Sequence, residues 1–116
     1  MAYTSTNLLT LQKYDPEVEI TEYTGDPCPG DGYFGKLDGI HTIQYSLTDF
    51  IGAIIFQVAL VFEPTEDDWA TIYCKEHELY SESESVIENI IGNFIWVRAG
   101  IRDWKHGSVN VIRMKT

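Results

Sequence analysis

Apolar and polar residues alternate along most of the chain, with the period of two that is typical of β-strands. Between Ile40 and Leu47, the side chains of Ile43, Tyr45 and Leu47 fall on one side and polar side chains on the other, which predicts a half-buried strand. Similar patterns predict strands over residues 7–13, 18–23, 69–74, 94–101 and 109–114. Turn-forming residues separate these segments. We therefore expect an all-β chain, a single antiparallel β-sandwich domain over residues 1–116 of Greek-key or jelly-roll type with long loops.

The last two predicted strands are separated by a short break, Lys105-His106-Gly107-Ser108. Glycine adopts at little cost the positive φ that a tight turn requires. We therefore predict a C-terminal hairpin that turns at Gly107 and leaves the nearby Trp104 exposed.

The segment from Ile51 to Phe62 is apolar on both faces, unlike the other predicted strands. One face carries Ile54, Phe56, Val58 and Leu60, and the other carries Ile55, Ala59 and Val61. Such a strand has to be covered on both sides. One interpretation is a contact between copies of the chain, made by Ile55, Gln57, Ala59 and Val61. The other is a central strand that is covered by long loops of the same subunit.

Three further segments lack the alternation of apolar and polar residues. Residues 25–32 include two prolines and three glycines, which predicts an irregular loop without ladder pairing. Residues 62–69 form an acidic connection after a strand. Residues 82–91 have an apolar spacing that a helix could use, but their serines and β-branched residues favour an exposed loop leading into a strand.

Size and charge narrow the possible functions. A chain of 116 residues buries roughly two-thirds of its unfolded surface, enough for one core. The formal charge of −10 disfavours nucleic acid and anionic membranes as partners. The N-terminal residues lack the pattern of a secretory signal, and the longest apolar run, residues 51–62, is too short for a membrane-spanning helix. Cys28 and Cys74 are therefore expected to be reduced thiols.

The charge is unevenly distributed. Residues 94–116 hold five of the eight basic side chains and only one of the eighteen acidic ones. If they share a face, Arg98, Arg102 and Arg113 could meet the acidic connection of a neighbouring subunit, or an underlying protein, and orient the association. The alternative is that these arginines lie beside the acidic connection of their own chain.

The sequence offers little support for catalysis or metal binding. Cys74 and His77 supply a thiol and an imidazole, but they lack the paired spacing of zinc sites. The acidic residues of the loops, which include Asp26, Asp31 and Asp38, do not follow the register of a calcium-binding loop. We therefore expect a non-enzymatic protein with no cofactor and no metal.

Aromatic side chains at strand ends and in loops are the remaining candidates for ligand contacts. Trp104, Tyr33 and Phe34 could stack on sugars, as rings do in carbohydrate-binding modules. Trp96 and Trp69 are better explained as core anchors.

Several segments together suggest a family. The run Gly92-Asn93-Phe94-Ile95-Trp96-Val97-Arg98-Ala99, the hairpin through Gly107 and the strand from Val109 to Met114 combine with two upstream segments, Phe56 to Leu60 and Pro64 to Trp69. Over roughly residues 50–116 the chain resembles small β-sandwich virion structural proteins of tailed bacteriophages, especially cyanophage-like ones.

This resemblance implies a decoration or accessory protein of the head, neck or tail, assembled in many copies in the host cytoplasm and located in the virion. Its expected partners are further copies of itself, through the strand that contains Ile55, and another capsid or tail protein. Nucleic acid and membranes are not expected partners. The alternative function is a carbohydrate-binding or adhesion module.

Overall fold

The computed structural model describes residues 6–18, 20–35, 39–82 and 84–115, with Phe34 and residues 78–82 described by their backbone alone. The strands are β1 (Thr6–Leu9), β2 (Gln12–Lys13), β3 (Tyr23–Thr24), β4 (Cys28–Pro29), β5 (Ile40–Ala59), β6 (Ala70–Glu82), β7 (Ser85–Ile91) and β8 (Trp96–Lys115). Two short 3₁₀ helices, η1 (Asp31–Phe34) and η2 (Glu66–Asp68), lie in the connections. Every strand pair is antiparallel, so the predicted all-β antiparallel class is confirmed. No helix among the described residues is long and apolar enough to cross a membrane.

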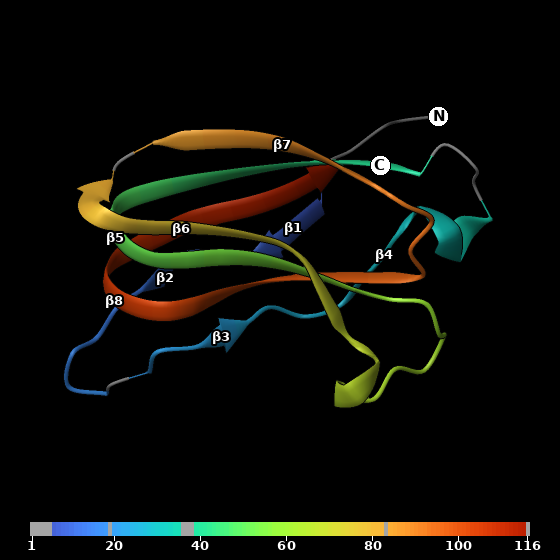
Figure 1. The fold of residues 1–116 in the computed structure, drawn as a ribbon, viewed down its shortest axis with the longest axis horizontal. Coiled ribbons are helices and arrows are strands. Elements are labelled where there is room, and N and C mark those ends of the chain that lie inside the picture. The colour runs from blue at the N-terminus through green and yellow to red at the C-terminus, as the bar shows by residue number, and fades with distance from the viewer. Residues whose placement is uncertain (1–5, 19, 36–38, 83, 116) are drawn as a thin grey trace.

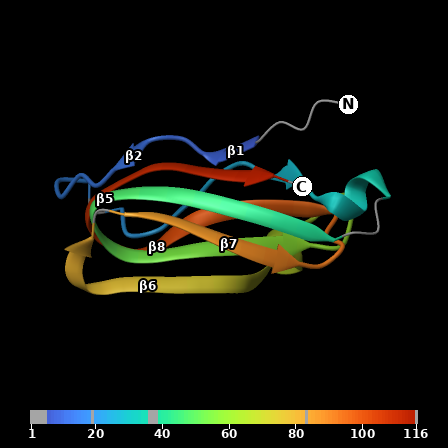
Figure 2. The same ribbon diagram turned by 90° about the horizontal axis from the view of Figure 1, so that it is seen from above.

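Two long strands, β5 and β8, organise the fold. They pair with each other along most of their length, and both bend midway, so that one eight-stranded sheet folds back over itself into two layers (Figures 1 and 2). Layer I contains β7, the first half of β5, the second half of β8, and β1 and β2. Layer II contains β6, the second half of β5, the first half of β8, and β3 and β4. The result is a sandwich-like arrangement.

The core lies between these layers, and alternation places its side chains there. From layer I come Ile43, Tyr45 and Ile112, and from layer II come Ile54 and Phe56, each at most 1% exposed. Burying side chains of this size stabilises a fold by about 1.5–3 kcal/mol each. The sequence correctly assigned Ile43 and Tyr45 to a buried face.

The predicted C-terminal hairpin is wrong. Strand β8 runs without reversal through Gly107, because both of its halves pair with the two halves of β5. Gly107 does have the positive φ expected of it, at 79°, but this φ serves the bend. Asp49 and Asp103 have φ of 50° and 52° at the corresponding bends of β5 and β8, and the register between the two strands shifts there.

Other predicted boundaries also differ. Of the described residues 18 and 20–23, which were expected to lie in one strand, only Tyr23 belongs to a strand, β3. The segment expected to be a loop before a strand, residues 82–91, instead contains strand β7, because it completes layer I beside β5. The loop at residues 25–32 does take part in the sheet, through the short pairing of β4 with β8. Strand β5 ends at Ala59, so Val61 lies beyond it.

Candidate functional site

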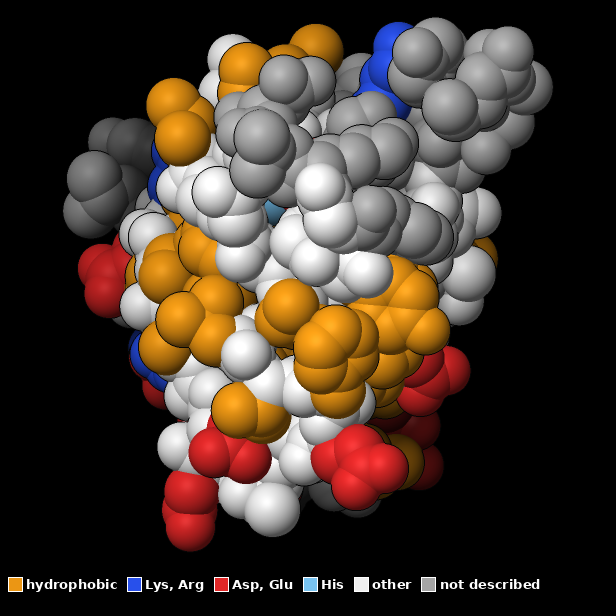
Figure 3. Space-filling model, turned by 90° about the vertical axis from the view of Figure 1, so that its right-hand side faces the viewer, with side chains coloured by type: hydrophobic (Ala, Val, Ile, Leu, Met, Phe, Trp, Pro, Cys, Tyr) orange, Lys and Arg blue, Asp and Glu red, His pale blue; other side chains and the backbone are white. Residues whose placement is uncertain are grey.

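A cluster of exposed apolar residues lies at the end of the sandwich away from the bends. We define the aromatic end surface as Tyr33 of η1, Leu60, Val61 and Phe62 after β5, and Trp96 at the start of β8. Leu60 and Phe62 are 69% and 63% exposed. Figure 3, which looks onto this end, shows hydrophobic side chains gathered across it, with acidic side chains below them. Large contiguous apolar patches are rare on the surfaces of monomeric proteins and often mark contact sites.

Ring contacts and one hydrogen bond hold this surface together. The Tyr33 ring centroid lies 5.1 Å from that of Trp96 and 5.7 Å from that of Phe62. The Trp96 indole Nε1 donates a hydrogen bond of 2.9 Å to the backbone oxygen of Phe62. The exposed chain after β5 is therefore fixed to β8, and its apolar side chains are presented from a defined position.

The loop that carries Tyr33 is anchored through a buried aspartate. Asp31 is 2% exposed, and its Oδ2 accepts a hydrogen bond of 2.8 Å from the Gly39 amide. The Asp31 amide donates to His41 Nε2 over 3.0 Å, which requires Nε2 to be unprotonated. Burial lowers the pKa of His41, and the nearby Asp31 charge opposes this shift. The Phe94 ring packs against the His41 ring, and their centroids are 5.1 Å apart.

The acidic connection is fixed to layer II by Arg98. This side chain is only 8% exposed, although its two terminal nitrogens reach the Glu66 carboxylate at 3.3 and 3.0 Å. Its Nε donates to Gln57 Oε1 over 2.7 Å, and its guanidinium carbon lies 4.3 Å from the Trp69 ring centre. Hydrogen bonds from Arg98, and then its charge, lower the pKa of Glu66. For Arg98, the alternative of contacts within its own chain is therefore confirmed.

The structure does not bring the three predicted interface arginines together. Arg98 and Arg102 lie on the outer face of layer II, opposite Gln57 and Ala53 of β5. Arg113 lies on the outer face of layer I, opposite Gln44, because the bend of β8 separates the two halves of the strand. Arg102 is half-buried and lines a cleft of about 260 Å³ with Tyr23, whereas Arg113 is exposed.

The predicted apolar interface is also divided. Ile55 and Ala59 are 4% and 1% exposed within the single chain, which agrees with the alternative of a central strand covered by its own subunit. Gln57 is half-buried and donates to Thr71 Oγ1 over 3.0 Å. Val61, at 44% exposed, belongs to the aromatic end surface.

The expected exposure of Trp104 is wrong. Trp104 is 4% exposed and packs in the core at the bend of β8, with its ring 5.7 Å from the Tyr14 ring in an edge-on arrangement. Of the three predicted stacking residues, Tyr33 lies on the aromatic end surface, and the side chain of Phe34 lies outside the described residues. The sequence did not single out Phe62 and Trp96 for this surface. Phe62 ends an apolar run that predicts a strand, and the alternation around Trp96 predicts a core position for that side chain.

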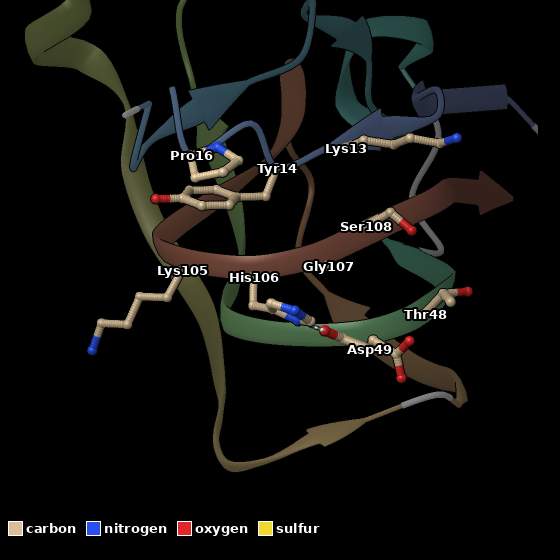
Figure 4. A pocket seen from close by; sticks show the side chains of 9 residues that line it. All are labelled: Lys13, Tyr14, Pro16, Thr48, Asp49, Lys105, His106, Gly107 and Ser108. Atoms are coloured by element: carbon tan, nitrogen blue, oxygen red, sulfur yellow. Dashed lines mark hydrogen bonds between the residues drawn. The ribbon is translucent and has the colours of Figure 1, made fainter. Parts of the chain in front are cut away.

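A second concavity, of about 470 Å³, lies at the bends. Figure 4 shows His106 directed toward Asp49, whose backbone oxygen is 2.7 Å from His106 Nδ1. Lys13 and Lys105 extend away from this centre in different directions. The lining therefore supplies no group of converging charges that could hold an anion.

A cluster of polar side chains, Tyr45, Tyr73 and His77, joins the two layers inside the core. The Tyr45 hydroxyl of layer I lies 2.8 Å from the Tyr73 hydroxyl and 3.5 Å from His77 Nε2, both in layer II. Glu84 lies 3.4 Å from His77 Nδ1. Burial raises the pKa of Tyr45, and of Tyr73 as well. These contacts are structural, because Tyr45 and His77 are closed to solvent.

The thiols and carboxylates considered as ligands are either far from one another or already hydrogen-bonded within the fold. Cys74 is exposed and His77 is buried, on opposite faces of β6, and both cysteines are free thiols. The Asp68 carboxylate caps its own helix by accepting from the Thr65 amide over 2.7 Å. Asp38 lies outside the described residues. Within the described part of the chain, no group of three ligating side chains could hold a metal ion.

Comparison with known proteins adds no relative. No protein-family model matches the chain, and no curated protein matches its sequence significantly.

Proposed function

We propose that this protein is a non-enzymatic structural component of a bacteriophage particle, a decoration or accessory protein that docks onto another particle protein. The observation that carries the docking is the aromatic end surface. Its exposed members Leu60 and Phe62 are held in place by the Trp96 hydrogen bond rather than left on a free loop. The resemblance of residues 50–116 to virion β-sandwich proteins supports the particle setting.

The rim of this surface supports a partner with a basic surface. Acidic side chains follow the apolar residues along the chain, from Glu63 to the exposed Asp67. A partner with an apolar centre and a basic rim would be complementary to this end, and charge complementarity increases the rate and selectivity of association. An acidic partner surface would be repelled.

Binding to purified particles tests this proposal. The encoding phage is purified by density gradient, and the protein is sought among its components by mass spectrometry. Particles that lack the protein are then titrated with the recombinant chain. Phe62→Asp should weaken this binding by at least about tenfold, because a charge would be buried at the contact. Val18→Asp is the matched control, since Val18 is 56% exposed away from this end. Absence from purified particles would overturn the particle role.

A carbohydrate-binding module remains the second candidate, for one specific reason. Tyr33 is 40% exposed and lies against Trp96, which is the kind of aromatic platform that stacks on sugar rings. Glycan-array binding that is lost in Tyr33→Ala, with an unchanged melting temperature, would favour this function. No glycan signal from the intact protein would remove it. Trp104 is buried, so its ring is not accessible to a sugar.

A further inference from the structure

The two outer strands on the β5 side of the sheet differ strongly in character. Among the described strands, β6 and β7 each pair only with β5, and each therefore ends one layer. Figure 2 shows both on the same side of the molecule. An outer strand presents unpaired backbone groups that can bind another strand, so proteins usually protect such edges with charged side chains.

Strand β6 is protected in this way, and β7 is not. Lys75 and Glu76 are exposed on β6. On β7 the exposed outer-face residues are uncharged, namely Ser85, Ile87, Asn89 and Ile91. Its single charged residue, Glu88, falls on the opposite face of the strand and is half-buried.

The unprotected edge is also strongly apolar. Ile87 and Ile91 are 63% and 76% exposed, and Ile40, directly opposite Ile91 on β5, is 51% exposed. Three isoleucines thus face outward together at one corner of layer I. Edge strands that combine β-branched apolar residues with little charge are prone to pair with another strand.

We propose that β7 pairs with β7 of a second copy, antiparallel about a two-fold axis, and so joins layer I of both copies into one continuous sheet. A two-fold contact needs only one self-complementary patch, which this edge supplies. The proposal is independent of docking through the aromatic end surface. It also gives the expected self-association a different location from the strand around Ile55, which its own chain covers.

Side-chain chemistry selects the register. A two-fold axis perpendicular to the sheet keeps equivalent faces on the same side. An axis through Glu88 would place two like charges opposite each other, which is destabilising. An axis through Asn89 instead places Ile87 opposite Ile91 of the second copy, twice, and moves Glu88 opposite Ile90. Asn89 would then face its own equivalent, while its Oδ1 accepts a hydrogen bond of 2.8 Å from Thr42 Oγ1 within the chain.

The contact is short, so the dimer should be reversible. Interfaces of less than about 1,200 Å² are typical of weak or transient associations. We therefore expect sedimentation velocity to show a monomer–dimer equilibrium as the protein concentration is raised. Ile87→Glu should raise the dissociation constant of the dimer by at least about tenfold, because it replaces two apolar pairs and adds like charges near the axis.

The matched control is Ile72→Glu, which puts the same charge on the other outer strand at a position that is 42% exposed. This variant should dimerise as the unmodified protein does. A chain that stays monomeric at all concentrations would overturn the proposal. So would a dimer that Ile87→Glu leaves intact, or one that Ile72→Glu dissociates.

A cysteine at the axis tests the register. In a Cys74→Ser background, Asn89→Cys should give a disulfide-linked dimer on mild oxidation, because directly opposite residues of antiparallel strands are within disulfide reach. Glu88→Cys in the same background should cross-link much less. Preferential cross-linking through Glu88→Cys, or none from either, would contradict the pairing through Asn89.

Discussion

The Arg98 guanidinium donates two hydrogen bonds to the Glu66 carboxylate, of 3.3 and 3.0 Å. These bonds hold the connection between β5 and β6 against the first half of β8. Arg98 is buried, whereas the Glu66 side chain is 83% exposed. The two partners are therefore unequal. Arg98 also contacts Gln57 and Trp69, and we expect these two contacts to supply most of its contribution to stability.

Replacing Arg98 should destabilise the fold more than replacing Glu66 does. Arg98→Ala leaves the half-buried Gln57 amide oxygen without its donor and removes the Arg98 contact with Trp69, so we expect a loss of about 1 kcal/mol. Glu66→Gln should have a much smaller effect, because an exposed ion pair is screened by solvent. Urea unfolding of both variants measures this difference. Equal losses of unfolding free energy would show that the ion pair dominates.

Protonation of His41 should reduce stability in mild acid. Burial lowers its pKa in the folded state, so below about pH 6.5, the usual histidine pKa, the unfolded chain binds more protons than the folded one. Above that pH, His41 does not reduce the free energy of unfolding. Below it, the free energy of unfolding falls as the pH decreases, by at most about 1.4 kcal/mol per pH unit. The free energy of unfolding measured between pH 5 and pH 8 gives this slope.

The matched variant for this test is His41→Gln. Its side-chain oxygen can still accept from the Asp31 amide, but it does not titrate. Between pH 5 and pH 7, the variant should lose the part of the pH dependence of its unfolding free energy that comes from His41. The part that comes from other groups should be unchanged. If its slope equals that of the unmodified protein, another group is responsible.

The tyrosine pair between the layers should be more sensitive at Tyr45 than at Tyr73. Tyr45→Phe removes the hydroxyl that contacts both Tyr73 and His77 in the core, and we expect a loss of about 1–2 kcal/mol. Tyr73→Phe leaves Tyr45 with its His77 contact, so its loss should be smaller. Thermal unfolding of the two single variants and the double variant gives the interaction energy between the two hydroxyls. A larger loss at Tyr73 would contradict this account.

Local pattern predicted the strand class well, because alternation directly reports which face of a strand is buried. It placed Ile43, Tyr45 and Leu47 on the core side, where all three lie. It also offered the correct alternative for Arg98, that it contacts its own chain. What it missed depends on long-range pairing. The positive φ of Gly107 suits a hairpin turn and a strand bend equally, and only the pairing of β8 with both halves of β5 distinguishes them.

The error at Gly107 also misplaced Trp104, and a separate error concealed the aromatic end surface. A reversal at Gly107 would have left Trp104 at an exposed turn, whereas the bend turns it into the core beside Tyr14. At the other end, the apolar run of β5 continues past Ala59 through Leu60 and Phe62, although these two residues have already left the sheet. Periodicity does not show where a strand loses its partner, so an exposed apolar surface resembled the end of a buried strand.

Two glycines with similar positive φ should respond very differently to alanine. Gly107 and Gly35 have φ of 79° and 69°, so alanine is strained at both positions by about 1–2 kcal/mol. At Gly35 an added Cβ meets nothing within 4 Å, whereas at Gly107 it would collide with the backbone oxygens of Asp49 and Thr48 on β5. Gly107→Ala should therefore cost at least about 3 kcal/mol, and Gly35→Ala only the backbone strain. Chemical denaturation of both variants measures the difference. Because that collision exists only if β8 passes β5 at the bend without reversing, equal losses at the two glycines would contradict the continuous strand and favour a hairpin turn at Gly107.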